Sequence, residues 1–181
     1  LSLIFPKKKL DLYGSMNGFD VADNSKYHYI GNNQVRKIFI LKNRSKINQA
    51  REVGFNAVYC YSICGIWFQL VASRVYWSHG INDFFAPLVC GATVVGLQHG
   101  APVKMGGRAR HKHLTLKRTS RLRYLKMNLR GLLYVLAPYL NHQYCNISIC
   151  GEHKFKSYVE DVLSWSKPLV FAEMLPRIQF L

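Results

Sequence analysis

The residues whose types and spacing could best support a chemical reaction lie in the segment from Val94 to Gly107. His99 follows an apolar run that predicts a buried strand, and in open α/β sheets ligands bind at the carboxyl ends of strands. Gly100 allows a ligand to approach the backbone closely, and Lys104 supplies a cation suited to phosphate. The set fits transfer of a phosphoryl group to a hydroxyl, with His99 accepting the hydroxyl proton and Lys104 offsetting phosphate charge. The alternative is a histidine that only hydrogen-bonds a loop.

Short β-rich runs alternate with helical segments, a pattern typical of βαβ units and a parallel sheet. Residues 45–53 predict a helix with Ser45 as its N-cap and Gly54 as its stop. Residues 63–71 are apolar on most faces and predict a buried crossover helix. Further helices are predicted over residues 114–136 and 151–165. The predicted strands are residues 37–42, 56–60, 74–77, 93–97, 146–150 and 169–171.

The charge balance is strongly positive, with 25 Lys and Arg against 9 Asp and Glu. Such a surface attracts polyanions, which include phosphate polymers, nucleic acid and anionic membranes. No carboxylate lies between Asp83 and Glu152, and the predicted helix over 114–136 in this gap is basic and amphipathic. That helix either packs against the sheet or lies on anionic lipid.

Composition narrows the class of protein further. The length fits a single folded domain, and 49% hydrophobic residues is too many for a disordered tail. The five cysteines contain no C-x-x-C pair, so we expect reduced thiols and no metal site. The longest apolar runs, 63–72 and 131–140, are about half of the ~20 residues needed to span a bilayer.

A resemblance to a known family enters at the histidine segment. Leu97-Gln98-His99-Gly100-Ala101-Pro102-Val103-Lys104 resembles the Leu-Trp-His-Gly-Thr-Pro-Leu-Lys motif of the CDP-glycerol glycerophosphotransferases, which build teichoic acids and related capsular polymers. Other elements follow in the family's order from about Gly14 onward. They are Asp23-Asn24-Ser25-Lys26-Tyr27, the strand over residues 37–42, the strand over residues 72–79, and Leu175-Pro176-Arg177.

The resemblance implies a GT-B fold, in which two Rossmann-like domains hold the acceptor and the donor. Residues 1–181 would then be a single acceptor-side Rossmann-like domain, with the CDP-binding donor domain missing. His99 would be the catalytic base that deprotonates the terminal hydroxyl of the acceptor for attack on the β-phosphorus of the donor, releasing CMP. The implied donor is CDP-glycerol or a related CDP-alditol, with no cofactor or metal.

Partners and location also follow from the resemblance. The acceptor would be a polyol-phosphate polymer on a lipid carrier, and the protein would sit peripherally on the anionic cytoplasmic face of the cell membrane.

The acceptor and phosphate contacts are assigned by position in the motifs. They are Asn24, Lys26, His79, Gly100, Lys104 and Arg177. For four of them an ordinary structural role is the alternative: Asn24 as a helix N-cap with Lys26 solvated, His79 as a loop residue and Arg177 as a solvated cation.

Two departures from the family pattern qualify this assignment. Gln98 and Ala101 stand where the family has Trp and Thr, which we interpret as variation that affects acceptor choice. Ile178 and Gln179 replace Asn-Asp, which predicts a truncated end and a fragment with little activity alone. The rival function is a basic module that binds nucleic acid or anionic lipid without catalysis. Because no RNA-recognition, KH or zinc-finger pattern supports it, we expect no nucleic-acid partner.

Overall fold

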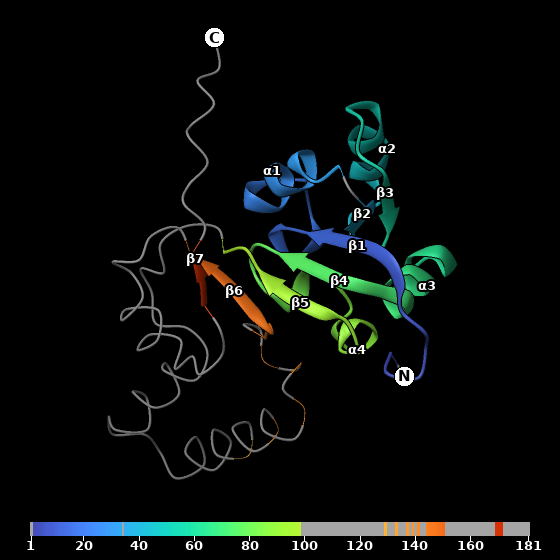
Figure 1. Ribbon diagram of the computed structural model, residues 1–181. Helices are drawn as coiled ribbons and strands as arrows, with labels where there is room; N and C mark the ends of the chain where they lie inside the picture. The colour runs from blue at the N-terminus through green and yellow to red at the C-terminus, as the bar shows by residue number, and fades with distance from the viewer. Residues whose placement is uncertain are drawn as a thin grey trace, which may run out of the picture.

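A seven-stranded parallel sheet organises the chain, with strand order β3-β2-β1-β4-β5-β6-β7. The computed structural model describes residues 2–33, 35–98, 129, 133, 137, 139, 141, 144–150 and 169–171. The strands are β1 (Lys8–Gly14), β2 (Arg36–Leu41), β3 (Ala57–Tyr59), β4 (Ala72–Trp77), β5 (Thr93–Gly96), β6 (Ile147–Cys150) and β7 (Leu169–Phe171). Figure 1 shows β1 and β4 side by side in the middle of this sheet. The Rossmann-like α/β fold predicted from the sequence is therefore confirmed.

Six of the seven strands were predicted to within a few residues, but the central strand β1 was missed. Its first residues are lysines, and Asp11 interrupts the apolar pattern. Asp11 is fully buried and accepts two hydrogen bonds from Arg74 on β4, Nε to Oδ1 at 2.8 Å and Nη2 to Oδ2 at 3.0 Å. This bidentate pair offsets the cost of burying the carboxylate, so the polar residue is compatible with a central strand.

Helices cover both faces of the sheet (Figure 1). They are α1 (Asp23–Gly31), α2 (Ser45–Glu52), α3 (Ile63–Val71) and α4 (Ala86–Val89), with short 3-10 turns η1 (Met16–Gly18) and η2 (Ile81–Asp83). Tyr29 of α1 and Ile47 of α2 pack on the face that carries Tyr13 and Phe39. Val71 of α3 belongs to the opposite core. Alternate residues of each strand thus feed two separate cores.

The start of α2 differs from the sequence prediction. Arg44 occupies the N-cap position, and Ser45 is the first helical residue rather than the cap. Asn43 takes over part of the capping role, because its Oδ1 accepts from the Ser45 N–H at 3.1 Å and from Ser45 Oγ at 2.8 Å. Gly54 is confirmed as the stop, since its φ of +89° lies in the left-handed region that favours glycine.

The bounds predicted for α3 are confirmed, but its predicted burial on most faces is wrong. Gln69 and Val71 are buried, whereas Ile63 is 88% exposed and Trp67 is 43% exposed. A surface helix buries only the stripe that meets the sheet, so the apolar residues on its other side stay exposed.

Several predictions lie wholly or partly outside the described residues. The helix over 151–165 is one of them, and for 114–136 only Leu129 and Leu133 are described, both helical and both exposed. Among the described residues no helix is long and apolar enough to cross a membrane. Among the cysteines that the structure describes, Cys60, Cys64 and Cys90 are free thiols.

Gly65→Ala is expected to lower the free energy of unfolding by about 3 kcal/mol. A β-carbon at Gly65 would overlap the carbonyl oxygen of Tyr59 and lie 2.9 Å from that of Cys60, so backbone would have to move. Chemical denaturation measures the change. The matched control is Gly31→Ala, because a β-carbon there meets nothing within 4 Å. Equal stability of the two variants would contradict the close packing of α3 on β3.

Candidate functional site

The strand order reverses beside β1, since β2 lies on one side of it and β4 on the other. In sheets of this kind ligands bind outside the carboxyl ends of the strands at such a switch point. Gly14 at the end of β1 pairs with Trp77 at the end of β4, which pairs in turn with Gly96 at the end of β5. The loops that follow these three strands therefore form one edge, which we call the switch edge.

Backbone conformations at the switch edge are unusual. Among the residues that the structure describes, four non-glycine residues have positive φ in the left-handed region: Met16 (49°), Asn17 (57°), Asp23 (55°) and Gln98 (53°). Met16 and Asn17 lie in the loop after β1, and Gln98 lies in the loop after β5. Asp23 is the first residue of α1, which follows the loop after β1. Such conformations cost about 1–3 kcal/mol each and gather at binding and catalytic sites. The clustering marks the switch edge as the candidate site.

Asn24 ties helix α1 to the segment that leads into His99. Its Nδ2 donates to the carbonyl oxygen of Leu97 at 3.2 Å and to that of Gln98 at 2.5 Å. The alternative role as an N-cap is wrong, because Ala22 holds that position and Asn24 lies within the helix. The sequence placed Asn24 at the acceptor cleft, and the structure places it at the switch edge beside the histidine segment.

His79 directly follows Ser78 after β4 and also lies at the switch edge. Its Nδ1 accepts the Met16 backbone N–H at 3.1 Å and lies 3.4 Å from Asp23 Oδ2. A nitrogen that accepts from Met16 carries no proton, so in the neutral ring the proton is on Nε2. Because Nδ1 then has no proton to share with Asp23, its bond from Met16 is the one that fixes the loop after β1. A quarter of the His79 side chain stays exposed.

Asp83 fixes the loops after β1 and β4 to each other. Its carboxylate is fully buried and accepts backbone N–H bonds from Asn17 at 2.7 Å, Ser78 at 3.2 Å and His79 at 3.4 Å. Burial raises the pKa of Asp83 to about 7, against the opposing effect of these hydrogen bonds and of the nearby Lys42 charge. The loops can close this tightly because position 14 is glycine; a β-carbon there would lie 2.6 Å from that of Asp83.

Two buried serines attach α1 to the ends of β1 and β4. Ser25 Oγ donates to the Gly14 carbonyl at 2.7 Å, and Ser78 Oγ donates to Ser25 Oγ at 2.6 Å. The Ser25 N–H donates to Ser78 Oγ at 3.1 Å. These bonds satisfy both hydroxyls and hold the first turn of α1, which carries Asn24, over the switch edge.

Lys26 is not brought together with Asn24. It lines a shallow cavity on another side of α1, formed with Tyr29, Ile30, Lys37, Val53, Gly54 and Phe55. Two helical steps separate the two residues by about 200° around the axis, which explains why they face different ways. The ammonium group of Lys37 in this cavity already makes hydrogen bonds within the protein, since its Nζ donates to the carbonyls of Tyr29 and Asn32 at the end of α1.

The remaining predicted site residues, His99, Gly100, Lys104 and Arg177, lie outside the described residues. Among the residues that are described, no group of three His, Cys, Asp or Glu could hold a metal ion. Sequence reasoning missed Asp83 and Ser78. The available signal was their position, because both follow the predicted strand over 74–77 within six residues, where polar side chains meet the switch edge.

Asn24→Ala is expected to speed amide hydrogen exchange in residues 93–98 by about fivefold or more, because it removes two hydrogen bonds, each worth about 1 kcal/mol, and so eases local opening. Mass spectrometry of peptides from this segment measures the rate. Asn48→Ala on the exposed face of α2 is the control and should leave the segment unchanged. Unchanged exchange in both variants would show that Asn24 does not anchor the segment.

The strand order and the loops gathered at the switch edge define a Rossmann-like domain of the GT-B type. Two solved structures of the wall teichoic acid polymerase TagF share this fold. One is a TagF variant soaked with CDPG, with a TM-score of 0.59 and 13% sequence identity. The matched region covers 92% of this chain and 39% of the TagF chain. The other has a TM-score of 0.57 and 15% sequence identity, and the matched region covers 91% of this chain and 38% of the TagF chain.

The chain thus spans about two fifths of the length of these TagF structures. The structural likeness agrees with the family resemblance that the sequence motifs carry, since TagF is a CDP-glycerol glycerophosphotransferase. At this identity the likeness shows a shared fold. No protein-family model matches the sequence, and no curated protein matches it.

Proposed function

We propose that this chain is the acceptor-side domain of a CDP-glycerol, or related CDP-alditol, glycerophosphotransferase that extends a teichoic-acid-like or capsular polymer. The observation that carries the proposal is the pair of hydrogen bonds from Asn24 to Leu97 and Gln98. They anchor the segment that leads directly into His99 at the switch edge, where this fold binds ligands. The likeness to TagF supports the same class of transferase.

In the proposed reaction the terminal hydroxyl of the acceptor polymer attacks the β-phosphorus of the donor. His99 takes the hydroxyl proton as the new oxygen–phosphorus bond forms, and the bond from that phosphorus to the bridging oxygen of CMP breaks. The bonding electrons leave with CMP. Because no covalent enzyme intermediate is needed, the protein contributes position and charge, with Lys104 and the backbone at Gly100 facing the phosphate.

The acceptor is proposed to lie along the switch edge. Asn24 keeps the segment that leads into His99 in place, and His79 is retained as an acceptor contact because it follows β4 at the same edge. Arg177 is retained as a phosphate contact because of its place in the Leu-Pro-Arg element. Lys26 is left out of the acceptor set, since it lines the cavity on another side of α1.

The donor is proposed to bind outside this domain. The TagF structures extend well beyond the part that matches this chain, and one of them was soaked with CDPG. A second Rossmann-like domain holding the CDP moiety would face the switch edge. The proposal requires no metal and no organic cofactor, and it places the acceptor polymer on a lipid carrier at the cytoplasmic face of the membrane.

The test is transfer of radiolabel from CDP-glycerol to a membrane-bound phosphate-polymer primer. This chain joined to a CDP-binding domain is expected to extend the primer, and this chain alone is expected to bind the primer without extending it. CDP-ribitol in parallel reports which alditol is accepted. Failure of the joined protein with every CDP-alditol, combined with saturable binding of nucleic acid, would overturn the proposal in favour of a basic binding module.

A further inference from the structure

Three aromatic side chains lie together at the carboxyl ends of the strands. Tyr59 is the last residue of β3, Tyr61 lies two residues further on, and Phe85 lies in the loop after β4, just past η2. Because β3 and β4 belong to the same parallel sheet, these residues lie at the same edge as the candidate site. Tyr61 is 48% exposed and Phe85 is 45% exposed, whereas Tyr59 is half-buried. We call these three residues the aromatic row.

The rings of the aromatic row contact one another in succession. The ring centroids of Tyr59 and Tyr61 are 5.6 Å apart and their planes are inclined by 75°. Those of Tyr61 and Phe85 are 6.1 Å apart, with planes inclined by 67°. Both are edge-to-face pairs, which are favourable arrangements of aromatic rings. Neighbouring rings therefore face different directions and form an angled apolar surface.

A buried glutamine fixes the two loops that carry the aromatic row. Gln69 of α3 is fully buried, and its Oε1 accepts the backbone N–H of Phe85 at 2.9 Å. Its Nε2 donates at 2.9 Å to the carbonyl of Cys60, which lies between Tyr59 and Tyr61 in the chain. These bonds satisfy the side-chain amide and join the loop after β4 to the loop after β3. The aromatic row is therefore formed before a ligand arrives, which lowers the cost of ordering it on binding.

Polar groups border the aromatic row. The guanidinium of Arg44, an exposed residue between β2 and α2, lies 4.4 Å from the centroid of the Tyr59 ring. In the part of the chain that the structure describes, no group hydrogen-bonds to this guanidinium or to the hydroxyls of Tyr59 and Tyr61. The row thus offers apolar ring faces together with available donors and acceptors.

We infer that the aromatic row binds a sugar ring of the acceptor polymer, with Arg44 pairing to the neighbouring phosphate. The inference rests on the proposed function and deepens it, because it makes the acceptor a sugar-containing phosphate polymer and not a plain polyol phosphate. One face of a pyranose carries C–H bonds, which match the negative face of an aromatic ring. The sugar hydroxyls can exchange hydrogen bonds with the two tyrosine hydroxyls, and a guanidinium fits phosphate geometry.

Other ligands of the acceptor edge fit the aromatic row less well. A plain polyol-phosphate chain has no ring to cover two half-exposed aromatic side chains. Single-stranded nucleic acid stacks successive bases on aromatic side chains. Bases in such a strand tend to lie parallel to one another, whereas neighbouring rings of the row are inclined by 75° and 67°.

Titration calorimetry of this chain with two soluble oligomers tests the inference. One is a glycerol-phosphate oligomer that carries a glucose on each repeat, and the other is the same oligomer without sugar. The glucosylated oligomer is expected to bind about tenfold more tightly. Tyr61→Ala should lower its affinity to that of the plain oligomer. Tyr61→Phe keeps the ring and should retain most of the preference.

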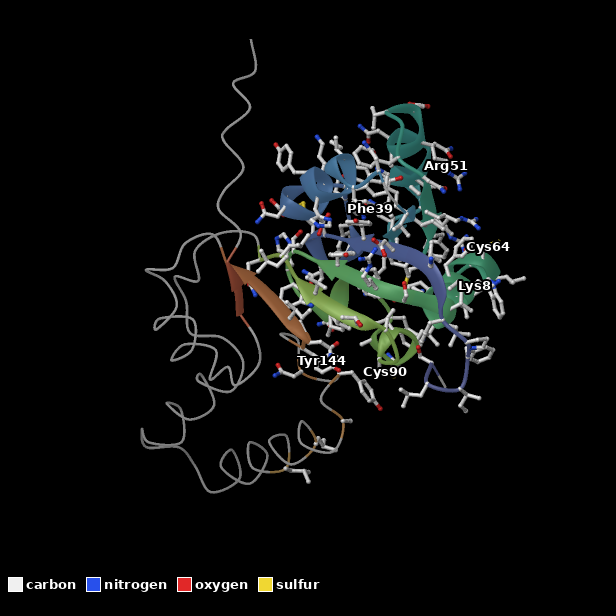
Figure 2. All side chains as sticks on the ribbon, viewed as in Figure 1. Lys8, Phe39, Arg51, Cys64, Cys90 and Tyr144 are labelled. Carbon is white, nitrogen blue, oxygen red and sulfur yellow. The ribbon has the colours of Figure 1, made fainter. Side chains whose placement is uncertain are left out.

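The matched control is Trp67→Ala, which removes an exposed aromatic ring elsewhere on the surface. Trp67 contacts Phe5 and lies 5.5 Å from Lys8 Nζ, and Figure 2 shows Lys8 where the chain enters β1. This variant should keep the full preference for the glucosylated oligomer. Circular dichroism checks that each variant folds.

Equal affinity of the unmodified chain for the two oligomers would overturn the inference and leave the proposed function standing. A preference that survives in Tyr61→Ala would overturn it as well, because the sugar would then bind elsewhere. Failure of both oligomers to bind would contradict the proposed function itself, and the inference would fall with it. Saturable binding of single-stranded nucleic acid that Tyr61→Ala abolishes would show that the aromatic row stacks bases instead.

Discussion

His99→Ala is expected to lower the rate of glycerol-phosphate transfer by about 10³-fold in the chain joined to a donor domain, with primer affinity unchanged. A positioned general base contributes about 10²–10⁴-fold, and the acceptor hydroxyl has no other assigned proton acceptor in the proposed site. Because the base acts on the proton in the transition state, the loss should fall on kcat. Initial rates across primer concentrations measure both parameters.

Chemical rescue gives the control for this variant. Added imidazole should restore part of the activity of His99→Ala, since a free base can occupy the space that the side chain leaves. Imidazole should have no effect on the joined protein that keeps His99. A loss confined to KM, without rescue, would show that His99 binds the acceptor instead of taking its proton.

Asp83→Asn is expected to flatten the pH dependence of stability between about pH 4 and pH 7. The pKa of Asp83 is raised to about 7 in the folded chain, above the ordinary value near 3.8. The folded state therefore holds a proton that the unfolded state has released, and the free energy of unfolding falls as pH rises through this window. A shift of this size amounts to a few kcal/mol.

The measurement is chemical denaturation of both proteins at several pH values. Other titrating groups, including His28, whose pKa burial lowers, contribute equally to the two proteins and cancel in the comparison. Asp20→Asn is the control, because Asp20 is a half-exposed carboxylate paired with Lys46. It should leave the slope unchanged. Parallel slopes for Asp83→Asn and the unmodified chain would show that Asp83 is not held protonated.

The sheet could be predicted where a strand contains a short, largely apolar run. Strands β2 to β7 each contain such a run, as expected for a parallel sheet that helices cover. β1 was not predicted because Asp11 interrupts its apolar pattern. Arg74, which offsets the burial of this carboxylate, lies 63 positions away in the sequence. A bidentate ion pair between two strands depends on the tertiary structure, so no local sequence pattern predicts it.

The candidate site was predicted in part for a similar reason. The histidine motif and Asn24 have local signatures, and the switch edge follows from the strand order. The role of Asp83 depends on three backbone N–H groups from two different loops, so it appears only when β1 and β4 lie side by side. The exposure of Ile63 and Trp67 was missed because an apolar sequence does not reveal which side of a helix the sheet covers.

The most direct test of the central claim is titration calorimetry of this chain with a soluble glycerol-phosphate oligomer. The acceptor-side assignment predicts a saturable heat of binding when the oligomer is titrated and none when CDP-glycerol is titrated. Asn24→Ala should weaken it by about tenfold, through loss of one anchored hydrogen-bond pair. Saturable binding of CDP-glycerol, or no binding of the oligomer, would contradict the assignment of this domain to the acceptor.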